Sequence, residues 1–307
     1  MMKFSKKTLT RLVTVICILS MLLFMLYRSG LSSNKSFPVY KYYNYSKAVP
    51  LQDSLHIILD TTTYKLYSIT YNSVNDKKVT GLLSIPKNKL LPVPVIILMH
   101  GLGDHKTVDY IEYGHSVLLK NGYAVLRLDI YNHADRKESS LNFDLTGSQK
   151  YWSRTIMTQT VFDLRRAVDF IETRKELDSK KTGYFGISLG GIIGVIFCGV
   201  EHRIKVPVIG LAGGQMNLLF KEKALTKDAK DFVSIIEPLN FIKDISPRPL
   251  LMLNAKNDDI VPPMMSKLLY NDAKKTKNII WYQAKHRNIP LKTFYQDGLN
   301  WFDTYLK

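Results

Sequence analysis

Short hydrophobic runs alternate with longer amphipathic stretches along most of this chain. Val93 to Met99 is a nearly continuous apolar run, which is typical of a strand buried on both faces. The best helical pattern is Val161, Leu164, Val168 and Ile171, spaced by three, four and three residues. Further short β-prone runs lie at 123–128, 182–185, 206–211, 250–253 and 279–282. Strands that alternate with helices predict an α/β fold, with a mostly parallel central sheet and helices on both faces.

Two other β-prone runs precede the parallel part. Tyr64 to Tyr71 and Val79 to Ser84 are separated by a polar segment that contains Asn75 to Lys78. Two such runs on either side of a polar turn are typical of an antiparallel hairpin. We therefore expect a hairpin-like pair at the start of the sheet.

The N-terminus has a different pattern, with basic residues followed by an uncharged apolar stretch, Leu12–Tyr27. This layout predicts that residues 1–31 form an N-terminal hydrophobic helix that anchors the chain in a membrane or directs its export. The stretch is long for a signal peptide and slightly short for a membrane span, so both a single-pass anchor and a cleaved signal remain open. The positive flank favours a catalytic domain on the non-cytoplasmic side, or a secreted one if the segment is cleaved.

The amino-acid composition indicates where the domains begin and argues against some functions. Residues 32–55 are rich in Ser, Tyr, Asn and Lys without a clear period, which indicates a linker before a catalytic domain at 56–307. The net charge is +17, but Lys and Arg are scattered and no nucleic-acid-binding motif is found, so no nucleic-acid partner is expected. Cys17 and Cys198 lie in different contexts and imply no disulfide framework.

The strongest chemical signal is Gly186-Ile187-Ser188-Leu189-Gly190. It directly follows a predicted strand and precedes an apolar helical run, which is the context that makes a G-x-S-x-G motif informative. The glycines allow a tight turn that exposes the serine hydroxyl, and the following helix directs its N-terminal amides to the same place. Ser188 is therefore the candidate nucleophile, although a glycine-rich turn with an incidental serine has the same pattern.

A serine hydroxyl needs a base within hydrogen-bond reach, and in this architecture the acid and the base follow in the order Ser, Asp, His. Asp258 lies in the segment after the strand at 250–253, and His286 follows the strand at 279–282. His286 is the candidate base, and Asp258 would fix its tautomer. Asp259 is adjacent, so the residues alone leave the choice between the two carboxylates open.

The candidate oxyanion donors are the backbone N–H groups of Leu102 and Leu189. Leu102 follows the strand at 93–99, where such enzymes take one donor, and Leu189 follows the nucleophile. His100 is expected to orient this loop rather than to react. The remaining histidines do not form a metal-ligand spacing with cysteine or carboxylate residues, so neither a metal nor another cofactor is predicted.

Together these segments resemble the α/β-hydrolase superfamily, and more narrowly its dienelactone hydrolase, acetyl xylan esterase and prolyl oligopeptidase-like branches. The resemblance runs from about Tyr64 to Lys307 and is carried by PVPVIILMHGLGDHK, GYFGISLGG, PRPLLMLNAKNDDIVPP and AKHR. In the family pattern the acid stands three residues before a Val-Pro pair, which implies Asp258 rather than Asp259.

The resemblance and the motifs predict a serine hydrolase that cleaves a carboxylic ester through an acyl-enzyme. Only about residues 213–236 are available for a lid, so a small or short-acyl substrate is expected. A serine peptidase or amidase of the same fold is one alternative. A catalytically silent hydrolase fold that serves as a binding module is another.

Overall fold

The computed structural model describes residues 14–15, 18–21, 38–87 and 89–307. Tyr40–Lys307 forms one compact unit, separate from Met1–Val39. The predicted N-terminal helix, Leu12–Tyr27, lies mostly outside the described residues. Within the part of the chain that is described, no helix has both the length and the apolar character needed to cross a membrane.

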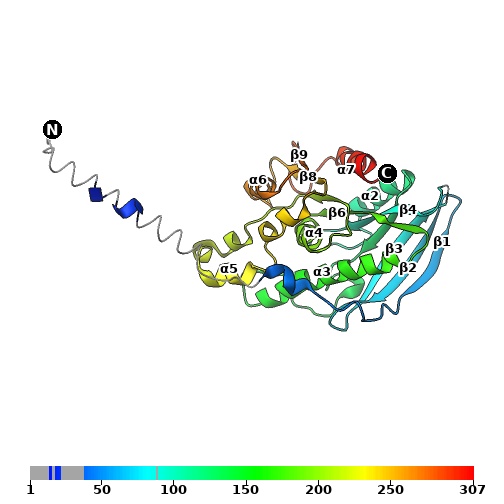
Figure 1. Ribbon diagram of the computed structural model, residues 1–307, viewed down its shortest axis with the longest axis horizontal. Helices are drawn as coiled ribbons and strands as arrows, with labels where there is room; N and C mark the ends of the chain where they lie inside the picture. Colours follow the sequence, from blue (N-terminus) through cyan, green and yellow to red (C-terminus); the bar gives the residue numbers. More distant parts are fainter. Residues whose placement is uncertain (1–13, 16–17, 22–37, 88) are drawn as a thin grey trace. The chain divides into compact units, whose positions relative to one another are not determined.

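The compact unit is built around one nine-stranded sheet with the order β1-β2-β3-β5-β4-β6-β7-β8-β9 (Figure 1). The first three strands pair antiparallel, as does β3 with β5, and the remaining pairs are parallel. The strands are β1 (Ser54–Asp60), β2 (Tyr64–Asn72), β3 (Lys78–Pro86), β4 (Val93–Met99), β5 (Ala124–Leu128), β6 (Leu177–Ile187), β7 (Val206–Gly210), β8 (Leu250–Ala255) and β9 (Lys277–Tyr282). The predicted mostly parallel sheet and the antiparallel pair before it are confirmed.

Helices cover both faces of this sheet, as predicted. On one face, α2 (Asp109–Lys120) and α7 (Leu291–Tyr305) share a hydrophobic cluster with side chains of the parallel strands. On the opposite face, α3 (Lys150–Glu172) packs against α4 (Leu189–Val200) (Figure 1). The other elements are η1 (Val39–Tyr43), η2 (Ala134–Arg136), η3 (Met216–Lys223), α5 (Lys227–Val233), η4 (Pro238–Asn240), η5 (Ile242–Ile245) and α6 (Pro263–Asp272).

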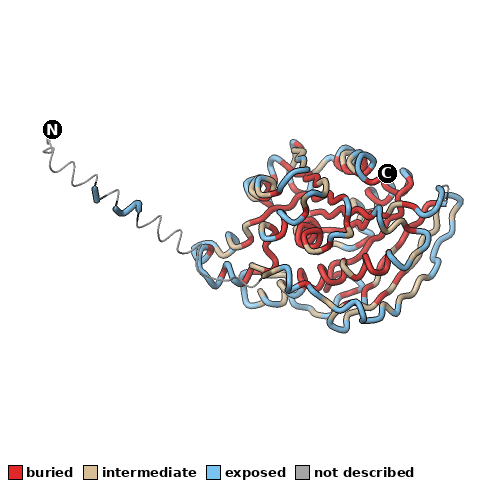
Figure 2. Tube along the Cα trace, in the orientation of Figure 1, coloured by how far each residue is buried: buried red, intermediate tan, exposed pale blue. Residues whose placement is uncertain are grey.

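The core follows the central strands. Every residue of β4 except Pro94 is buried, because helices cover the strand from both sides (Figure 2). Burying one Val, Leu or Ile side chain stabilises the folded state by about 1.5–3 kcal/mol. The continuous apolar run in the sequence thus places β4 at the centre of the sheet. The loop that begins at His100 therefore starts at the carboxyl end of a buried strand.

The segment expected to be a linker, residues 32–55, is not a linker throughout. From Tyr40 onward it belongs to the compact unit. Tyr43 is fully buried and its hydroxyl donates a hydrogen bond to the Ile235 carbonyl oxygen at 2.6 Å. The first strand, β1, begins at Ser54 and was also not anticipated. The aromatic ring of Tyr43 explains the difference, because it packs against the rings of Phe162 and Phe241 and is not exposed as in a linker.

Candidate active site

The predicted nucleophile lies on a sharp turn between β6 and α4. Ser188 has φ 55° and ψ −119°, a conformation that residues with a Cβ rarely adopt. The chain packs tightly around this turn: a Cβ at Gly190 would lie 2.4 Å from the His100 carbonyl oxygen, and one at Gly186 would lie 2.4 Å from the Gly190 oxygen. The two glycines of the motif therefore allow the close approach that raises Ser188 above the sheet.

The structure brings the three predicted residues into one hydrogen-bonded chain. The Ser188 hydroxyl is 2.9 Å from Nε2 of His286. On the other side of the ring, Nδ1 of His286 is 2.8 Å from Oδ2 and 2.9 Å from Oδ1 of Asp258. Because a carboxylate only accepts, Nδ1 carries the proton and Nε2 is free to accept one from Ser188. This is the geometry that a serine nucleophile with a histidine base requires.

Asp258 is fixed by its own loop. Its Oδ1 accepts hydrogen bonds from the backbone N–H groups of Ile260 at 2.9 Å and Val261 at 2.7 Å. Asp259 is different, because its side chain is 55% exposed and its nearest cation is Lys285 at 3.9 Å. Of the two adjacent carboxylates, only Asp258 contacts His286 among the described residues.

His100 holds the loop after β4, as expected. Its Nε2 accepts a hydrogen bond from the Ile130 N–H at 3.1 Å, so its Nδ1–H donates to the Gly101 carbonyl oxygen at 2.7 Å. Burial lowers the pKa of His100 to about 4, which keeps the ring neutral at physiological pH. A neutral ring with both nitrogens occupied serves as a spacer between two backbone segments and has no free site for proton transfer.

The predicted oxyanion donors, Leu102 and Leu189, belong to two segments that lie next to the nucleophile. Leu189 is the first residue of α4, where the helix dipole favours negative charge. Leu102 follows Gly101, at which a Cβ would lie 3.3 Å from the Cβ of Ser188. Neither amide has a hydrogen-bond partner among the described residues. Both N–H groups therefore remain available to an oxygen atom of a bound substrate.

Tyr110 is a further residue at this site that the sequence pattern did not indicate. Its hydroxyl accepts a hydrogen bond from the Gly101 N–H at 2.8 Å and donates to Oδ2 of Asp104 at 2.9 Å. No motif marks this residue, which lies in the first turn of α2. Only the packing of α2 beside the loop brings its hydroxyl there.

The acidic residues after β5 stabilise the neighbouring loop. Asp129 is fully buried and its Oδ1 accepts the Lys106 N–H at 2.7 Å. The Lys106 ammonium bridges Asp129, at 2.5 Å, and Asp135, at 2.6 Å. These contacts tie the segment after β4 to the segment after β5. They also leave no vacant ligand cluster here, and no group of metal-ligating residues is found in the described parts of the chain.

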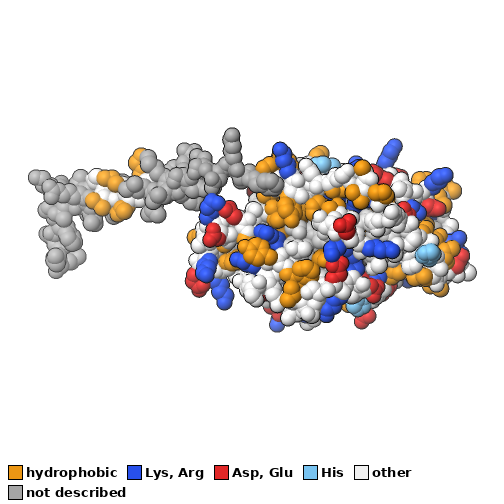
Figure 3. Space-filling view, turned by 90° about the horizontal axis from the view of Figure 1, so that it is seen from below, with side chains coloured by type: hydrophobic (Ala, Val, Ile, Leu, Met, Phe, Trp, Pro, Cys, Tyr) orange, Lys and Arg blue, Asp and Glu red, His pale blue; other side chains and the backbone are white. Residues whose placement is uncertain are grey.

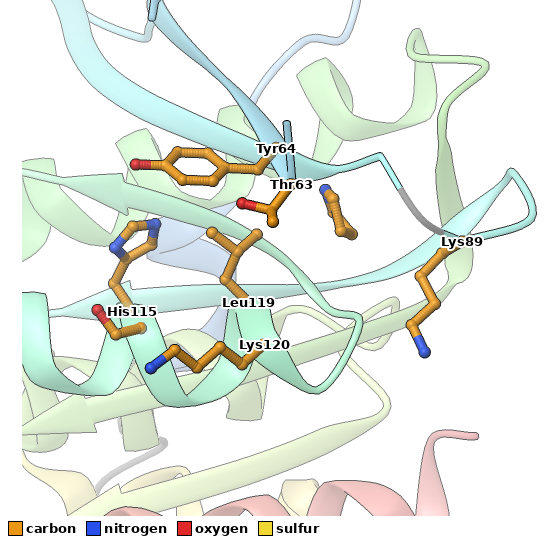
Figure 4. A pocket seen from close by; sticks show the side chains of 8 residues that line it. Thr63, Tyr64, Lys89, His115, Leu119 and Lys120 are labelled. Carbon is orange, nitrogen blue, oxygen red and sulfur yellow. The ribbon is translucent and has the colours of Figure 1, made fainter. Parts of the chain in front are cut away.

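A cavity of about 320 Å³ lies elsewhere, between the end of α2 and the β2–β3 pair (Figure 4). It is lined by Thr63, Tyr64, Pro86, Lys89, His115, Ser116, Leu119 and Lys120. None of the predicted site residues contributes to it. The candidate active site is therefore defined by the hydrogen-bonded triad and not by this cavity.

Charged side chains of both signs are mixed on the surface. In the view of Figure 3, Lys and Arg side chains are dispersed among acidic and hydrophobic ones rather than gathered in one groove. Several basic side chains are also paired within the fold; Arg203, for example, contacts Asp169 at 2.7 Å and Glu201 at 2.7 Å. On the face shown, the basic side chains therefore form no continuous patch.

Solved structures with the same architecture include several esterases. An acetyl xylan esterase from Paenibacillus sp. R4 superposes with a TM-score of 0.74 at 18% identity, covering 90% of this chain and 96% of that one. Acetyl xylan esterase 1 from Thermoanaerobacterium sp. JW/SL YS485 gives a TM-score of 0.71 at 16% identity, covering 86% of this chain and 91% of that one. At these identities the likeness establishes the α/β-hydrolase fold.

Two proteins of known sequence are similar to part of this chain. A putative hydrolase, YtaP, from Bacillus subtilis (strain 168) is 24% identical over 198 residues, which cover 58% of this chain and 64% of the relative. The uncharacterized protein YfhR from Escherichia coli (strain K12) is 24% identical over 148 residues, which cover 48% of this chain and 52% of the relative. The matches thus span less than two thirds of either relative.

The profile of the acetyl xylan esterase (AXE1) family matches residues 27–210, more than half of the chain and including Ser188. This chain belongs to the acetyl xylan esterase (AXE1) family.

Proposed function

We propose that this protein is a serine carboxylic-ester hydrolase that acts through an acyl-enzyme on Ser188. The observation that carries the proposal is the continuous hydrogen-bonded chain from Ser188 through His286 to Asp258, with separations of 2.9 and 2.8 Å. Membership of an esterase family supports it, as does the fold shared with solved esterases. The peptidase and the silent binding module are not favoured by either observation.

The geometry suits a two-step acyl transfer. Nε2 of His286 accepts the Ser188 proton while Oγ bonds to the ester carbonyl carbon, whose π electrons move to the oxygen. The N–H groups of Leu102 and Leu189 stabilise that oxyanion. His286 then donates the proton to the departing alkoxide, which leaves as the alcohol. Water, deprotonated by His286, attacks the acyl carbon and forms a second tetrahedral intermediate. When this intermediate breaks its bond to Oγ, the carboxylic acid is released and His286 returns the proton to Ser188. Asp258 stabilises the imidazolium formed in each step.

The proposed substrate is an ester with a short acyl group, acetyl in the first instance. The family and the solved relatives are named for acetyl xylan esterase activity. Leu102 and Ile260 are exposed in the loops after β4 and β8, and Met264 is exposed in the first turn of α6. The segment between β7 and β8 forms short helices instead of a large lid domain. We therefore expect a shallow site that buries few methylene groups of an acyl chain, each contributing about 0.8 kcal/mol at most.

A series of p-nitrophenyl esters tests both the activity and the acyl preference. We expect acetyl to butyryl esters to give the highest kcat/KM and longer chains to give no further gain, with amides as poor substrates. The series should be run with and without detergent, because a membrane or a detergent micelle can complete an apolar site. An optimum at about twelve carbons or more would contradict the short-acyl proposal, and a lack of turnover on every ester would contradict the esterase itself.

A phosphonate probe separates an active hydrolase from a silent fold independently of the substrate. Such a probe reacts with a serine only when a base activates it. We expect stoichiometric labelling of the native protein on the peptide that contains Ser188. A protein that folds but takes up no label would favour the binding-module alternative.

We also propose that the catalytic domain lies on the non-cytoplasmic side of a membrane, held there by Leu12–Tyr27. The basic flank before this stretch supports the orientation. Trypsin added to intact cells or spheroplasts is then expected to digest the domain while a cytoplasmic marker stays protected. Protection of both proteins until lysis would refute export. Recovery of a soluble form that begins near Ser33 would show that the segment is a cleaved signal.

A further inference from the structure

The peptide that carries one proposed oxyanion donor is fixed at its carbonyl oxygen. This peptide joins Gly101 to Leu102, and its oxygen accepts the Nδ1–H of His100 at 2.7 Å. In a trans peptide the N–H points away from the C=O. The direction of the Gly101 carbonyl therefore sets the direction in which the Leu102 N–H points.

The preceding backbone N–H is fixed as well, by Tyr110. The Tyr110 hydroxyl accepts the Gly101 N–H at 2.8 Å and is oriented by donating its own proton to Asp104 at 2.9 Å. The side chains of Ser188 and Tyr110 both approach Gly101 closely: a Cβ added there would be 3.3 Å from the Cβ of Ser188 and 3.4 Å from the Tyr110 hydroxyl. Tyr110 thus holds the backbone of Gly101 at a place next to the nucleophile.

We propose that Tyr110 is a positioning residue for the oxyanion site, acting through its hydroxyl on Gly101. This inference rests on the proposed esterase function and goes beyond it, since neither the motif nor the family match assigns a role to this side chain. Rotation of Gly101 toward the substrate would place its N–H, rather than that of Leu102, at the developing oxyanion. Because the Tyr110 hydroxyl accepts the hydrogen bond of the Gly101 N–H, it favours the conformation in which the Leu102 N–H is the free donor.

The ring and the hydroxyl of Tyr110 have separable roles. The ring packs against the hydrophobic cluster shared by α2 and α7. The hydroxyl makes only the two polar contacts with Gly101 and Asp104 among the described residues. Substitution by phenylalanine keeps the packed ring and removes both hydrogen bonds, so it tests the hydroxyl alone.

The test compares Tyr110→Phe with Tyr113→Phe in the full-length protein, using p-nitrophenyl acetate. Tyr113 lies one turn further along α2, is 38% exposed, and its hydroxyl has no hydrogen-bond partner in the described parts of the chain. Loss of a whole oxyanion donor costs roughly 100- to 1,000-fold in kcat, so a donor that is only misdirected should cost about 10- to 100-fold. We expect this loss in kcat for Tyr110→Phe, with KM within about three-fold, and no change for Tyr113→Phe.

A boronic acid that mimics the tetrahedral intermediate supplies a second readout. Its affinity should fall in parallel with kcat, because it uses the same oxyanion donors. A Tyr110→Phe enzyme with native kcat would overturn the proposal, as would a loss confined to KM. If the native enzyme turns over no ester, the proposed function itself has failed, which is a distinct result.

Asp104→Asn covers the case in which Tyr110→Phe does not fold. This change keeps the Tyr110 hydroxyl but replaces the carboxylate that orients its proton. We expect a smaller loss of kcat, of about three- to ten-fold, again with little change in KM. Native kcat in a folded Asp104→Asn protein, together with unchanged boronic acid affinity, would count against the hydrogen-bonded arrangement. Where both single variants fold, their effects should not add in the double variant, because both act on Gly101.

Discussion

Ser188→Ala is expected to lower kcat for an acetyl ester by about six orders of magnitude and to abolish phosphonate labelling, while the melting temperature stays close to that of the native protein. The change removes one hydroxyl and leaves the turn and its glycines unaltered. His286→Ala should be similarly inactive, because the members of a triad act as a unit. Initial rates, labelling and circular dichroism on the same preparations check all three expectations.

The fold supplies a matched control for this experiment. Ser84 is also hydrogen-bonded to a histidine, with its Oγ 2.8 Å from Nε2 of His115. Ser84 is fully buried, so no ester can reach it. Ser84→Ala should therefore retain native turnover and labelling. Labelling that persists in Ser188→Ala, at Ser84 or at another serine, would refute the assignment of the nucleophile.

The second large effect is expected at Asp258. In the native site one oxygen, Oδ1, accepts the N–H groups of Ile260 and Val261. In Asp258→Asn the amide oxygen should keep those two bonds, which turns the NH₂ group toward Nδ1 of His286. Nδ1 must then accept, so the proton moves to Nε2 and the ring no longer accepts a proton from Ser188. By analogy with the equivalent change in a known triad, kcat should fall by about ten-thousand-fold.

Asp259→Asn is the matched control, since it makes the same chemical change one residue away. Asp259 is largely exposed and lies 3.9 Å from the exposed Lys285, a pairing that contributes little to stability. We expect kcat/KM within about two-fold of the native value. A larger loss for Asp259→Asn than for Asp258→Asn would mean that a different carboxylate supports His286 in solution.

Strands with a buried face were predictable from the sequence, and an exposed edge strand was not. The run from Val93 to Met99 corresponds residue for residue to β4, because a strand covered on both sides must be apolar throughout. In β1, by contrast, Ile57, Ile58 and Leu59 are all exposed at the edge of the sheet. With neither face buried, no period of two appears in the sequence, and the strand is recognisable only from its pairing with β2.

Some residues of the candidate site were likewise predictable from the sequence, and one was not. Ser188, His286 and the pair Asp258 and Asp259 were predictable because each follows a strand, and the carboxyl ends of parallel strands meet at one edge of a sheet. The choice of Asp258 within the pair came from the family resemblance. Their catalytic roles remain predictions until the variants are measured. Tyr110 had no such signal, because its contact with Gly101 depends on how α2 packs beside the loop. Side chains that act through tertiary contacts leave no spacing in the sequence.

The backbone conformation at Ser188 has a consequence for how this protein can be stabilised. At φ 55° and ψ −119° any side chain is strained, at a cost of about 1–3 kcal/mol, whereas glycine tolerates such angles. Glycine is therefore the residue that the fold alone would favour at position 188. A selection for thermal tolerance without an activity screen should enrich Ser188→Gly and yield hardier proteins that no longer turn over esters. At this one residue, resistance to heat and catalysis make opposite demands on the sequence.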